Sequence, residues 1–592
     1  MFTTRPEILG TFGVVASTHW LATAAGMATL ENGGNAFDAA VATGLALQVV
    51  EPHLNGPGGD LPVLLHDARR GATEAICAQG VAPAAASIAA FRDLGLDLVP
   101  GTGLLATCVP GAFDGWMLML RDYGTMTLSQ VFGHCIAYAR DGYPLVPRIS
   151  GTIETVKELF ETEWPSSAAV YLPGGKVPAA GSIFRNPAMA AFYERLVREA
   201  EAGGGSREAQ IDRARDIWYR GWVAETIGRF CRDNAFLDVS GRRNRGMLTA
   251  DDMAAWQATV EKPLAYDYGR YTVYKCGPWS QGPALLQQLA ILKGMGLDGG
   301  DPSGPEFVHL VVEAAKLAFA DREAYYGDPN FVDVPMQQLL SDAYNDGRRA
   351  LVGDAASLEL RPGAIAGFAA GPIAQGRAET ADKFAGAVGE PTVKRSGRTI
   401  GDTCHVDVID RHGNMVSATP SGGWLQSSPV IPEFGFCLGS RMQMFWLDDS
   451  SPNALAPGKR PRTTLSPSLA ARDGTPWLSF GTPGGDQQDQ WQVSMFLHLA
   501  HHGMNLQQAI DAPNFHTEHF PSSFWPRAAR PGYVRVEGQF PAATVDALRA
   551  RGHDVEVGEP WSEGRLTAAA KEGELLKAAA NPRGMQGYAI GR

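Results

Sequence analysis

The most constraining feature of this 592-residue chain is a hairpin pattern that begins abruptly at Thr403. From Thr403 to Asp407, polar residues alternate with apolar ones, which is the period of a half-buried strand. Residues 411–413 predict a three-residue hairpin loop that ends in glycine. A loop of this length sets a register in which Thr403 lies opposite Ser421 on the same face. The pattern therefore brings two hydroxyl groups together at the open end of the hairpin.

The segment before Thr403 has a different character. Residues 361–402 are rich in glycine, alanine and proline and show no sustained helical or strand period. A structureless run of this length inside a compact domain favours a linker, a mobile segment or a processed region. We interpret residues 361–402 as a mobile linker.

Two interpretations of Thr403 are open at this point. The simpler one is that threonine is a good strand residue. The other is that the bond between Asp402 and Thr403 is cut, so that the freed α-amine can take the proton of the Thr403 hydroxyl, oriented by Ser421. A cut one residue later would make Cys404 the nucleophile, but the register places Cys404 on the opposite face from Ser421.

Elsewhere the chain predicts a mixed α/β protein. Residues 11–50 predict a strand followed by two helices, with Asn35 as the N-cap of the second helix. Helical patterns dominate residues 110–260, within which residues 203–215 predict a surface insertion, and residues 305–326 predict a long helix.

Composition excludes several classes of function. Apolar residues make up 45% of the chain and charged residues 19%, which is typical of a globular protein. The net charge of −12 argues against a nucleic-acid partner. No run of 18 or more apolar residues occurs, so we expect no membrane-spanning helix. Seven dispersed cysteines and a start without a signal-peptide pattern predict a cytoplasmic protein with reduced thiols.

A pair of glycines follows a later strand pattern. Gly484 and Gly485 come shortly after residues 476–480, which have strand character. Consecutive glycine amides after a strand can point two N–H groups at one oxyanion. Taken alone, such a pair more often marks an ordinary turn.

Together, segments along nearly the whole chain resemble the gamma-glutamyltransferase family of N-terminal-nucleophile hydrolases. The ordered matches lie at residues 14–17, 31–40, 109–115, 123–126, 137–142, 320–322, 327–332, 403–405, 410–414, 459–461, 466–467, 481–485, 512–516 and 580–583. The resemblance implies a four-layer αββα sandwich, made as one precursor that cuts itself before the nucleophile. Residues 1–402 would form a large subunit and residues 403–592 a small one, intertwined in a single fold.

The resemblance also implies roles for particular residues, by position. Thr403 matches the nucleophile, and Ser421 takes the place of a second threonine with its hydroxyl kept. Gly484 and Gly485 match the glycines of the oxyanion hole. A serine pair that holds the substrate's α-carboxylate is replaced by Thr463 and Thr464.

Four departures from the family pattern concern the substrate. The family's carboxylate-binding arginine is Gln79 here, and an asparagine two residues after the second threonine is Gly423. The glutamine and aspartate that grip an α-amino group fall on Arg441 and Met444. Loss of an aspartate and gain of an arginine would disfavour a zwitterionic amino-acid head. The segment 445–461 is also shorter than is typical, which implies a site without a lid.

The resemblance and its departures predict an autoprocessed amide hydrolase (an amidohydrolase or acylase). Its substrate would be a small amide whose acyl group bears a carboxylate and lacks the α-amino group of a gamma-glutamyl compound. Arg441 would bind that carboxylate, and the alternative is that Arg441 is an ordinary surface arginine. Two other functions stay open: gamma-glutamyl transfer or glutathione hydrolysis through a rebuilt pocket, and a non-catalytic binding protein that kept the fold.

We expect no cofactor and no metal. No phosphate-binding or dinucleotide fingerprint occurs in the sequence. His516 and His519 are three residues apart, but no third ligand is evident, so we interpret them as structural. The expected partners are a small-molecule amide substrate and the two subunits of one precursor, without nucleic acid or membrane, and a homo-oligomer is left open.

Overall fold

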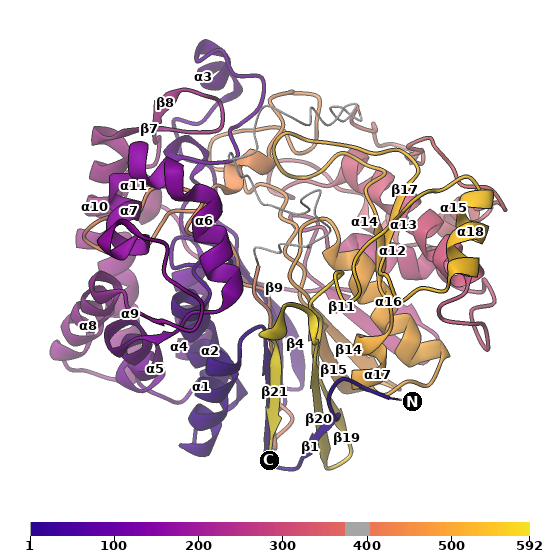
Figure 1. The fold of residues 1–592 in the computed structure, drawn as a ribbon, viewed down its shortest axis with the longest axis horizontal. Helices are drawn as coiled ribbons and strands as arrows, with labels where there is room; N and C mark the ends of the chain where they lie inside the picture. Colours follow the sequence, from indigo (N-terminus) through magenta and orange to yellow (C-terminus); the bar gives the residue numbers. More distant parts are fainter. Residues whose placement is uncertain (1, 373–402) are drawn as a thin grey trace.

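Two antiparallel seven-stranded sheets form the centre of the molecule (Figure 1). The computed structural model describes residues 2–372 and 403–592. Sheet I consists, in spatial order, of β21 (Tyr588–Gly591), β2 (Gly13–Ser17), β12 (Val406–Asp410), β13 (Met415–Ala418), β3 (Leu61–Asp67), β4 (Ala72–Ala78) and β9 (Thr259–Glu261). Sheet II consists of β1 (Ile8–Gly10), β20 (Leu575–Ala580), β19 (Thr567–Glu572), β15 (Thr475–Gly481), β14 (Ser468–Arg472), β11 (Tyr271–Lys275) and β10 (Leu264–Tyr268).

Helices cover the outer face of each sheet, so the layers follow the order αββα that we predicted (Figure 1). On the side of sheet I lie α1 (Trp20–Glu31), α2 (Ala36–Val50), α4 (Ala112–Tyr123), α5 (Leu128–Asp141), α6 (Pro147–Thr162), α7 (Pro165–Tyr171), α8 (Pro187–Ala202), α9 (Arg207–Tyr219), α10 (Trp222–Asp233) and α11 (Ala250–Ala254). On the side of sheet II lie α12 (Pro283–Leu292), α13 (Pro305–Tyr325), α14 (Met336–Leu339), α15 (Asp342–Arg349), α16 (Gln488–His501), α17 (Leu506–Asp511) and α18 (Ala542–Ala550).

Shorter elements complete the chain. A three-stranded sheet consists of β16 (Phe515–Thr517), β17 (Tyr533–Val536) and β18 (Asp554–Val557). Two small hairpins are formed by β5 (Tyr143–Pro144) with β6 (Ile183–Phe184), and by β7 (Ala235–Leu237) with β8 (Arg243–Arg245). The helix α3 (Ile88–Asp93) lies apart, beyond the end of the first helical layer (Figure 1).

Three hydrophobic cores fill the spaces between the four layers. One core joins α1, α2, α4 and α5 to sheet I, with Val41 and Val406 among its members. A second core joins α12, α13 and α16 to sheet II, with Leu286 and Phe480 among its members. A thinner third core fills the space between the sheets with small and branched side chains such as Ala569. Because each sheet is covered on both faces, its central strands are buried on both sides, whereas the edge strands β9, β10 and β1 are partly exposed.

Both halves of the chain contribute strands to both sheets. In sheet I, β12 lies between β2 and β13, and β13 lies beside β3. Strands from before residue 373 therefore alternate with strands from after residue 402 in one hydrogen-bonded sheet. The division into residues 1–402 and 403–592 stays a prediction, but this topology would keep the two pieces together after a cut.

Local sequence signals account for several of these elements. The Asn35 side chain accepts hydrogen bonds from the amides of Phe37 and Asp38, and Asp38 returns the bond, so α2 begins with a capping box. The predicted strand and two helices of residues 11–50 are thereby confirmed. The predicted surface insertion at 203–215 is wrong in its second half, because α9 begins at Arg207 and buries Ile211 in the core.

The segment before Thr403 is described only in part. Residues 361–372 contain no helix or strand, and residues 373–402 lie outside the described residues, so the mobile linker stays a prediction. Across the described ranges, we find no helix that combines the length and the apolar character needed to cross a membrane.

Candidate active site

The hairpin that begins at Thr403 has the register that its turn predicts. The strands β12 and β13 pair Val406 with Ala418, and the same register continues to an isolated bridge between Thr403 and Ser421. The turn glycine, Gly413, has a φ of +87°, as a three-residue loop requires. The Thr403 hydroxyl donates a hydrogen bond of 3.1 Å to the Ser421 hydroxyl, and both side chains are fully buried. The predicted meeting of two hydroxyls is confirmed.

Cys404 points away from this pair. Its thiol lies 3.0 Å from the Glu51 carboxylate, in the core between the first helical layer and sheet I. Burial and the neighbouring Glu51 raise the pKa of the Cys404 thiol well above its ordinary range. A thiol that stays protonated is a poor nucleophile. The structure therefore disfavours a cysteine nucleophile at this position.

The loop that carries Gly484 and Gly485 follows directly on β15. Gly484 has a φ of +123°, and a Cβ there would lie 2.6 Å from the Trp491 ring, so the position requires glycine. The carbonyl of Gly484 accepts a hydrogen bond from Gln488, and the carbonyl of Gly485 accepts one of 3.3 Å from Gln281. Because a trans peptide points its N–H away from its carbonyl, the Gly485 amide faces away from Gln488.

Arg565 connects this loop to Thr403 at the start of the hairpin. Its backbone amide donates to the Thr482 hydroxyl at 3.0 Å, and its guanidinium donates to the Thr403 carbonyl at 3.4 Å. The oxyanion candidates and Thr403 are thus held by one residue. No motif in the sequence signalled Arg565, because it lies in an irregular segment before β19.

Three of the predicted substrate residues meet around Asp60. The Arg441 guanidinium donates through Nε to the Asp60 carboxylate at 2.7 Å, and the Gln79 amide lies 3.5 Å from the other carboxylate oxygen. The Met444 sulfur lies 3.9 Å from Arg441 Nη1. Asp60 also exchanges two backbone hydrogen bonds with Ser421, which places the group next to the hydroxyl pair.

Arg441 is therefore no surface residue. It is 2% exposed, so the alternative of an ordinary surface arginine is wrong. Burial raises the pKa of the Asp60 carboxyl, and the Arg441 charge opposes this shift. The sequence showed the gain of a cation at 441 but not its carboxylate partner, 381 residues earlier in the chain. The positive charge gained at Arg441 is balanced by the Asp60 carboxylate, so the local charge is not simply reversed.

The glycine at 423 is explained by close backbone packing. Gly423 has a φ of +66°, and a Cβ there would lie 3.0 Å from the backbone of Gly58 and Gly59. Both the left-handed conformation and the tight backbone contact favour glycine at this position.

Thr463 is linked to the glycine loop through Gln281, and Thr464 is the next residue. The Thr463 carbonyl accepts a hydrogen bond of 2.8 Å from the Gln281 amide, and the Gln281 side chain binds the Gly485 carbonyl. The Thr464 hydroxyl is buried and has no hydrogen-bond partner within residues 2–372 and 403–592. These threonines thus lie beside the oxyanion loop, and nothing shows that they contact the Arg441–Asp60 pair.

A buried charge network holds the loops of the site, and the sequence did not predict it. Arg322 donates to Asp486 at 2.5 Å and to Glu323 at 2.8 Å, and Arg462 lies 2.7 Å from Glu323. Asp486 directly follows the glycine pair. The network thus ties Arg322, which belongs to the motif at 320–322, to the residue that follows the glycine pair.

The shortened segment 445–461 does not leave the site open. Thr403 is fully buried and Arg441 is 2% exposed, so the expected open site is not observed in this structure. Arg527 instead donates to the carbonyls of Gln443 and Phe445 at 2.9 and 2.8 Å and fixes the turn that carries Arg441.

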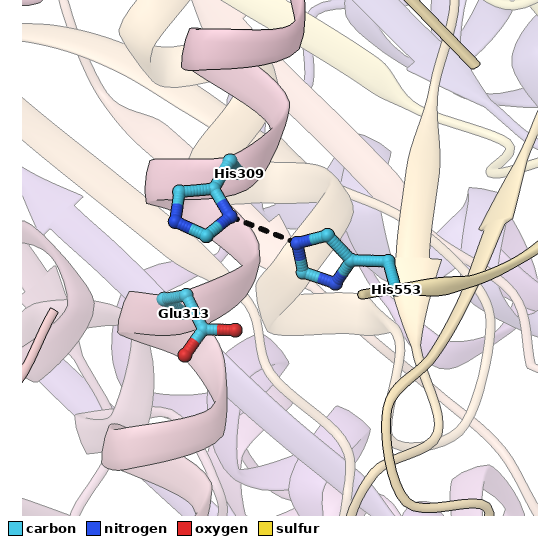
Figure 2. Close-up of side chains that lie close together, drawn as sticks. All are labelled: His309, Glu313 and His553. Carbon is cyan, nitrogen blue, oxygen red and sulfur yellow. Dashed lines mark hydrogen bonds between the residues drawn. The ribbon is translucent and has the colours of Figure 1, made fainter. Parts of the chain in front are cut away.

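One group of side chains in the described part of the chain has the composition of a metal site. His309, Glu313 and His553 lie together at α13, as Figure 2 shows. The two imidazoles are joined by a hydrogen bond of 2.8 Å, and Glu313 forms an ion pair of 2.7 Å with Lys316. The two facing imidazole nitrogens and the carboxylate thus have partners within the protein, and a cation faces the carboxylate. We interpret the group as a structural network.

His516 and His519 also have partners within the protein. The His516 ring lies 3.1 Å from Glu563 and 3.3 Å from Glu518. The His519 Nδ1 accepts a hydrogen bond of 2.9 Å from the Gly532 amide. Their predicted structural role agrees with these contacts.

Comparison with known proteins identifies the family. The family model "Gamma-glutamyltranspeptidase" matches residues 22–591. The chain belongs to the gamma-glutamyltranspeptidase family. Curated relatives include the glutathione hydrolase-like YwrD proenzyme of Bacillus subtilis, which is 31% identical, with 99% of each chain covered. The oxamate amidohydrolase proenzyme of Klebsiella pneumoniae is 30% identical, with 97% of this chain and 98% of the relative covered.

Solved structures agree with this assignment. The structure of LmbA2991HD is 56% identical and superimposes with a TM-score of 0.94, with both chains fully covered. A cephalosporin acylase from Bacillus halodurans is 27% identical, with a TM-score of 0.83, covering 100% of this chain and 98% of its own. These neighbours confirm the fold of the N-terminal-nucleophile hydrolases. The chain is a hydrolase of the gamma-glutamyltranspeptidase family that acts on amide bonds.

Proposed function

We propose that the chain is a proenzyme that cuts itself between residues 402 and 403 and hydrolyses amides with Thr403 as nucleophile. The observation that carries the proposal is the 3.1 Å hydrogen bond between Thr403 and Ser421 at the start of β12. A strand start fixes the hydroxyl in space, and a cut there supplies the α-amine base that an internal threonine lacks. The names of relatives as proenzymes support processing.

In the proposed reaction, the Thr403 hydroxyl attacks the amide carbonyl while its own α-amine takes the proton. Ser421 orients the hydroxyl. The Gly484 and Gly485 amides stabilise the oxyanion, and the α-amine returns the proton to the leaving amine. Water then attacks the acyl-enzyme with the same amine as base, which releases the acid and regenerates Thr403.

The substrate class follows from the Arg441–Asp60 pair. Asp60 holds Arg441 through Nε and fixes the plane of the guanidinium. Arg441 Nη2 lies 3.6 Å from where a Cβ of residue 422 would stand, beside the backbone that follows Ser421. A fixed guanidinium next to the nucleophile suits a carboxylate. We propose that Arg441 binds a carboxylate of the acyl group, with Gln79 and Met444 at its sides.

A substrate panel tests this proposal. Monoamides of small dicarboxylic acids and matched neutral amides of equal size are assayed with the processed enzyme. We expect the carboxylated amides to have kcat/KM values about 100-fold higher, which corresponds to one or two charge-assisted hydrogen bonds. Equal rates for the neutral and carboxylated members would overturn the assignment of Arg441.

Gamma-glutamyl hydrolysis is a second candidate, and Asp60 is the observation that favours it. An amino-acid head needs an anion for its ammonium group, and Asp60 places one beside Arg441. Against it stands the direct 2.7 Å pairing of the two charges, which an ammonium would have to disturb. Turnover of a gamma-glutamyl anilide at a rate equal to that of the best dicarboxylic monoamide would favour this candidate.

A further inference from the structure

A buried polar cluster joins the nucleophile strand to the strand that leads into the oxyanion loop. It lies between sheets I and II, where the other contacts are mostly apolar. His405 and Asp407 of the first sheet face Ser479 of β15 and Thr567 of β19 in the second sheet. All four side chains are fully buried.

Asp407 locks the imidazole of His405. The carboxylate accepts hydrogen bonds from His405 Nε2 at 3.1 Å, from Ser479 at 2.5 Å and from Thr567 at 2.7 Å. Since a carboxylate only accepts, Nε2 carries the proton in this contact. In the neutral ring Nδ1 is then an acceptor, and the Thr419 hydroxyl donates to it at 2.9 Å. The ring is therefore fixed at both nitrogens.

The locked ring lies directly against Gly481. A Cβ at residue 481 would stand 2.2 Å from His405 Cε1, so the imidazole occupies the space that any other side chain would need. Gly481 is the last residue of β15, and Gly484 follows three residues later. His405 itself comes two residues after Thr403, on the same face of the strand. The ring thus stands between the nucleophile strand and the root of the oxyanion loop.

We propose that His405, locked by Asp407, is a positioning residue that sets the distance between Thr403 and the Gly484–Gly485 amides. The inference rests on the proposed function of Thr403. Oxyanion stabilisation depends on donors placed within a few tenths of an ångström of the developing charge, so a small shift between the sheets lowers the rate. His405 touches no substrate in this proposal and transfers no proton.

Two opposite changes test His405 as a spacer between Thr403 and the Gly484–Gly485 loop. His405→Ala removes the ring, and Gly481→Ala pushes a methyl group into it. We expect each change to lower kcat by about 100-fold and to leave KM within about threefold, because the loop acts on the transition state and not on ground-state binding. In Asp407→Asn an NH2 group would replace the oxygen that accepts from His405 and Ser479. We expect this variant also to lower kcat and to leave KM nearly unchanged.

The double variant gives the sharper result. In the His405→Ala background the added methyl group has room, so we expect Gly481→Ala to cost less than about threefold in kcat there. Additive losses, about 10⁴-fold in the double variant, would overturn the spacer. If His405→Ala does not fold or process, the same cycle is run with His405→Gln, whose smaller amide also vacates the Cε1 position. Rates are given per processed chain, counted by denaturing gel.

Two controls separate this inference from its premise. His134 is a half-buried histidine of α5, and we expect His134→Ala to keep the wild-type kcat. Thr403→Ala is assayed alongside. Turnover that survives Thr403→Ala would overturn the proposed function and with it the spacer. If turnover is lost in Thr403→Ala but the kcat losses of Gly481→Ala and His405→Ala are additive, the positioning role of His405 alone is overturned.

Discussion

The hydroxyl pair and the Arg441–Asp60 pair are neighbours, but they are built in different ways. Thr403 and Ser421 are 18 residues apart and belong to one hairpin, whose hydrogen-bond ladder fixes their distance. Arg441 and Asp60 are 381 residues apart. Asp60 continues the register between β3 and β13 through its bridge to Ser421, whereas Arg441 begins a short 3-10 helix, Arg441–Met444, outside both sheets. The first pair depends on strand register, which is strongly specified in a buried sheet. The second depends on charge complementarity between a sheet position and a segment outside the sheets, which can change while the sheet stays constant.

This contrast suggests a division of labour. The reaction would reside in the Thr403 hairpin, and the choice of substrate in the segments around Arg441. Relatives named glutathione hydrolase, acylase and oxamate amidohydrolase each match at least 96% of this chain, as such a division predicts. Substitutions in the two pairs should therefore have different kinetic signatures.

The largest effect is expected at the nucleophile. Thr403→Ala should abolish both self-cleavage and amide hydrolysis, with a loss of at least about 10⁴-fold, because the attacking hydroxyl is gone. Thr403→Ser should restore part of both activities. Steady-state assays and a denaturing gel measure the two effects. An intact, uncut Thr403→Ala chain with wild-type turnover would contradict the account.

The next effect concerns the Arg441–Asp60 pair. Arg441→Ala should lower kcat/KM for a carboxylated amide by about 100-fold and leave the neutral isostere unchanged. Measured rates for the two substrates give the ratio directly. An equal loss on both substrates would show that Arg441 serves the reaction and not substrate choice.

The same variant has a consequence for stability. Removal of Arg441 leaves the Asp60 carboxyl buried without its guanidinium, which should lower the free energy of unfolding by about 3 kcal/mol. The double variant Arg441→Ala with Asp60→Ala should recover part of this loss. Urea unfolding of both variants measures the difference, and a double variant less stable than the single one would contradict the pairing.

A smaller effect is expected for the orienting hydroxyl. Ser421→Ala removes one hydrogen bond to Thr403 and should lower kcat by about tenfold, with KM unchanged. Ser421→Thr keeps the hydroxyl and serves as the matched control, with kcat close to that of the wild type. A Ser421→Ala enzyme with unchanged kcat on all substrates would remove Ser421 from the site.

The smallest effect lies away from both pairs, at His516. Burial lowers the pKa of His516, but hydrogen bonds to Glu518 and Glu563 outweigh burial and raise the pKa to about 9. The charged ring thus contributes stability that is fully present below about pH 6.5 and is lost as the pH rises through about 9. The free energy of unfolding should fall by about 2 kcal/mol between pH 6.5 and 9.5, and the thermal midpoint by about 2 °C, because a chain of this length unfolds with an entropy of about 1.2 kcal/mol per kelvin. The same loss in His516→Gln would contradict the assignment.

The contrast between the pairs also explains what the sequence could predict. Strand alternation and a three-residue turn fix the Thr403–Ser421 contact, and capping at Asn35 marks the start of α2, because both signals are local. The charge at Arg441 was visible, but its partner Asp60 was not. No local pattern relates two residues that are 381 positions apart. The same reason hid Arg565 and the Arg322–Asp486 network. The helix α9 is different, because its signals are local: Ser206 caps it, and Ile211, Ala214 and Trp218 recur with helical spacing.

The mass of the purified wild-type chain under denaturing conditions tests the central claim most directly. The account predicts two fragments, with the smaller one beginning at Thr403, and a loss of cleavage in Thr403→Ala. A single uncut chain that hydrolyses amides, or a small fragment that begins at Cys404, would contradict it.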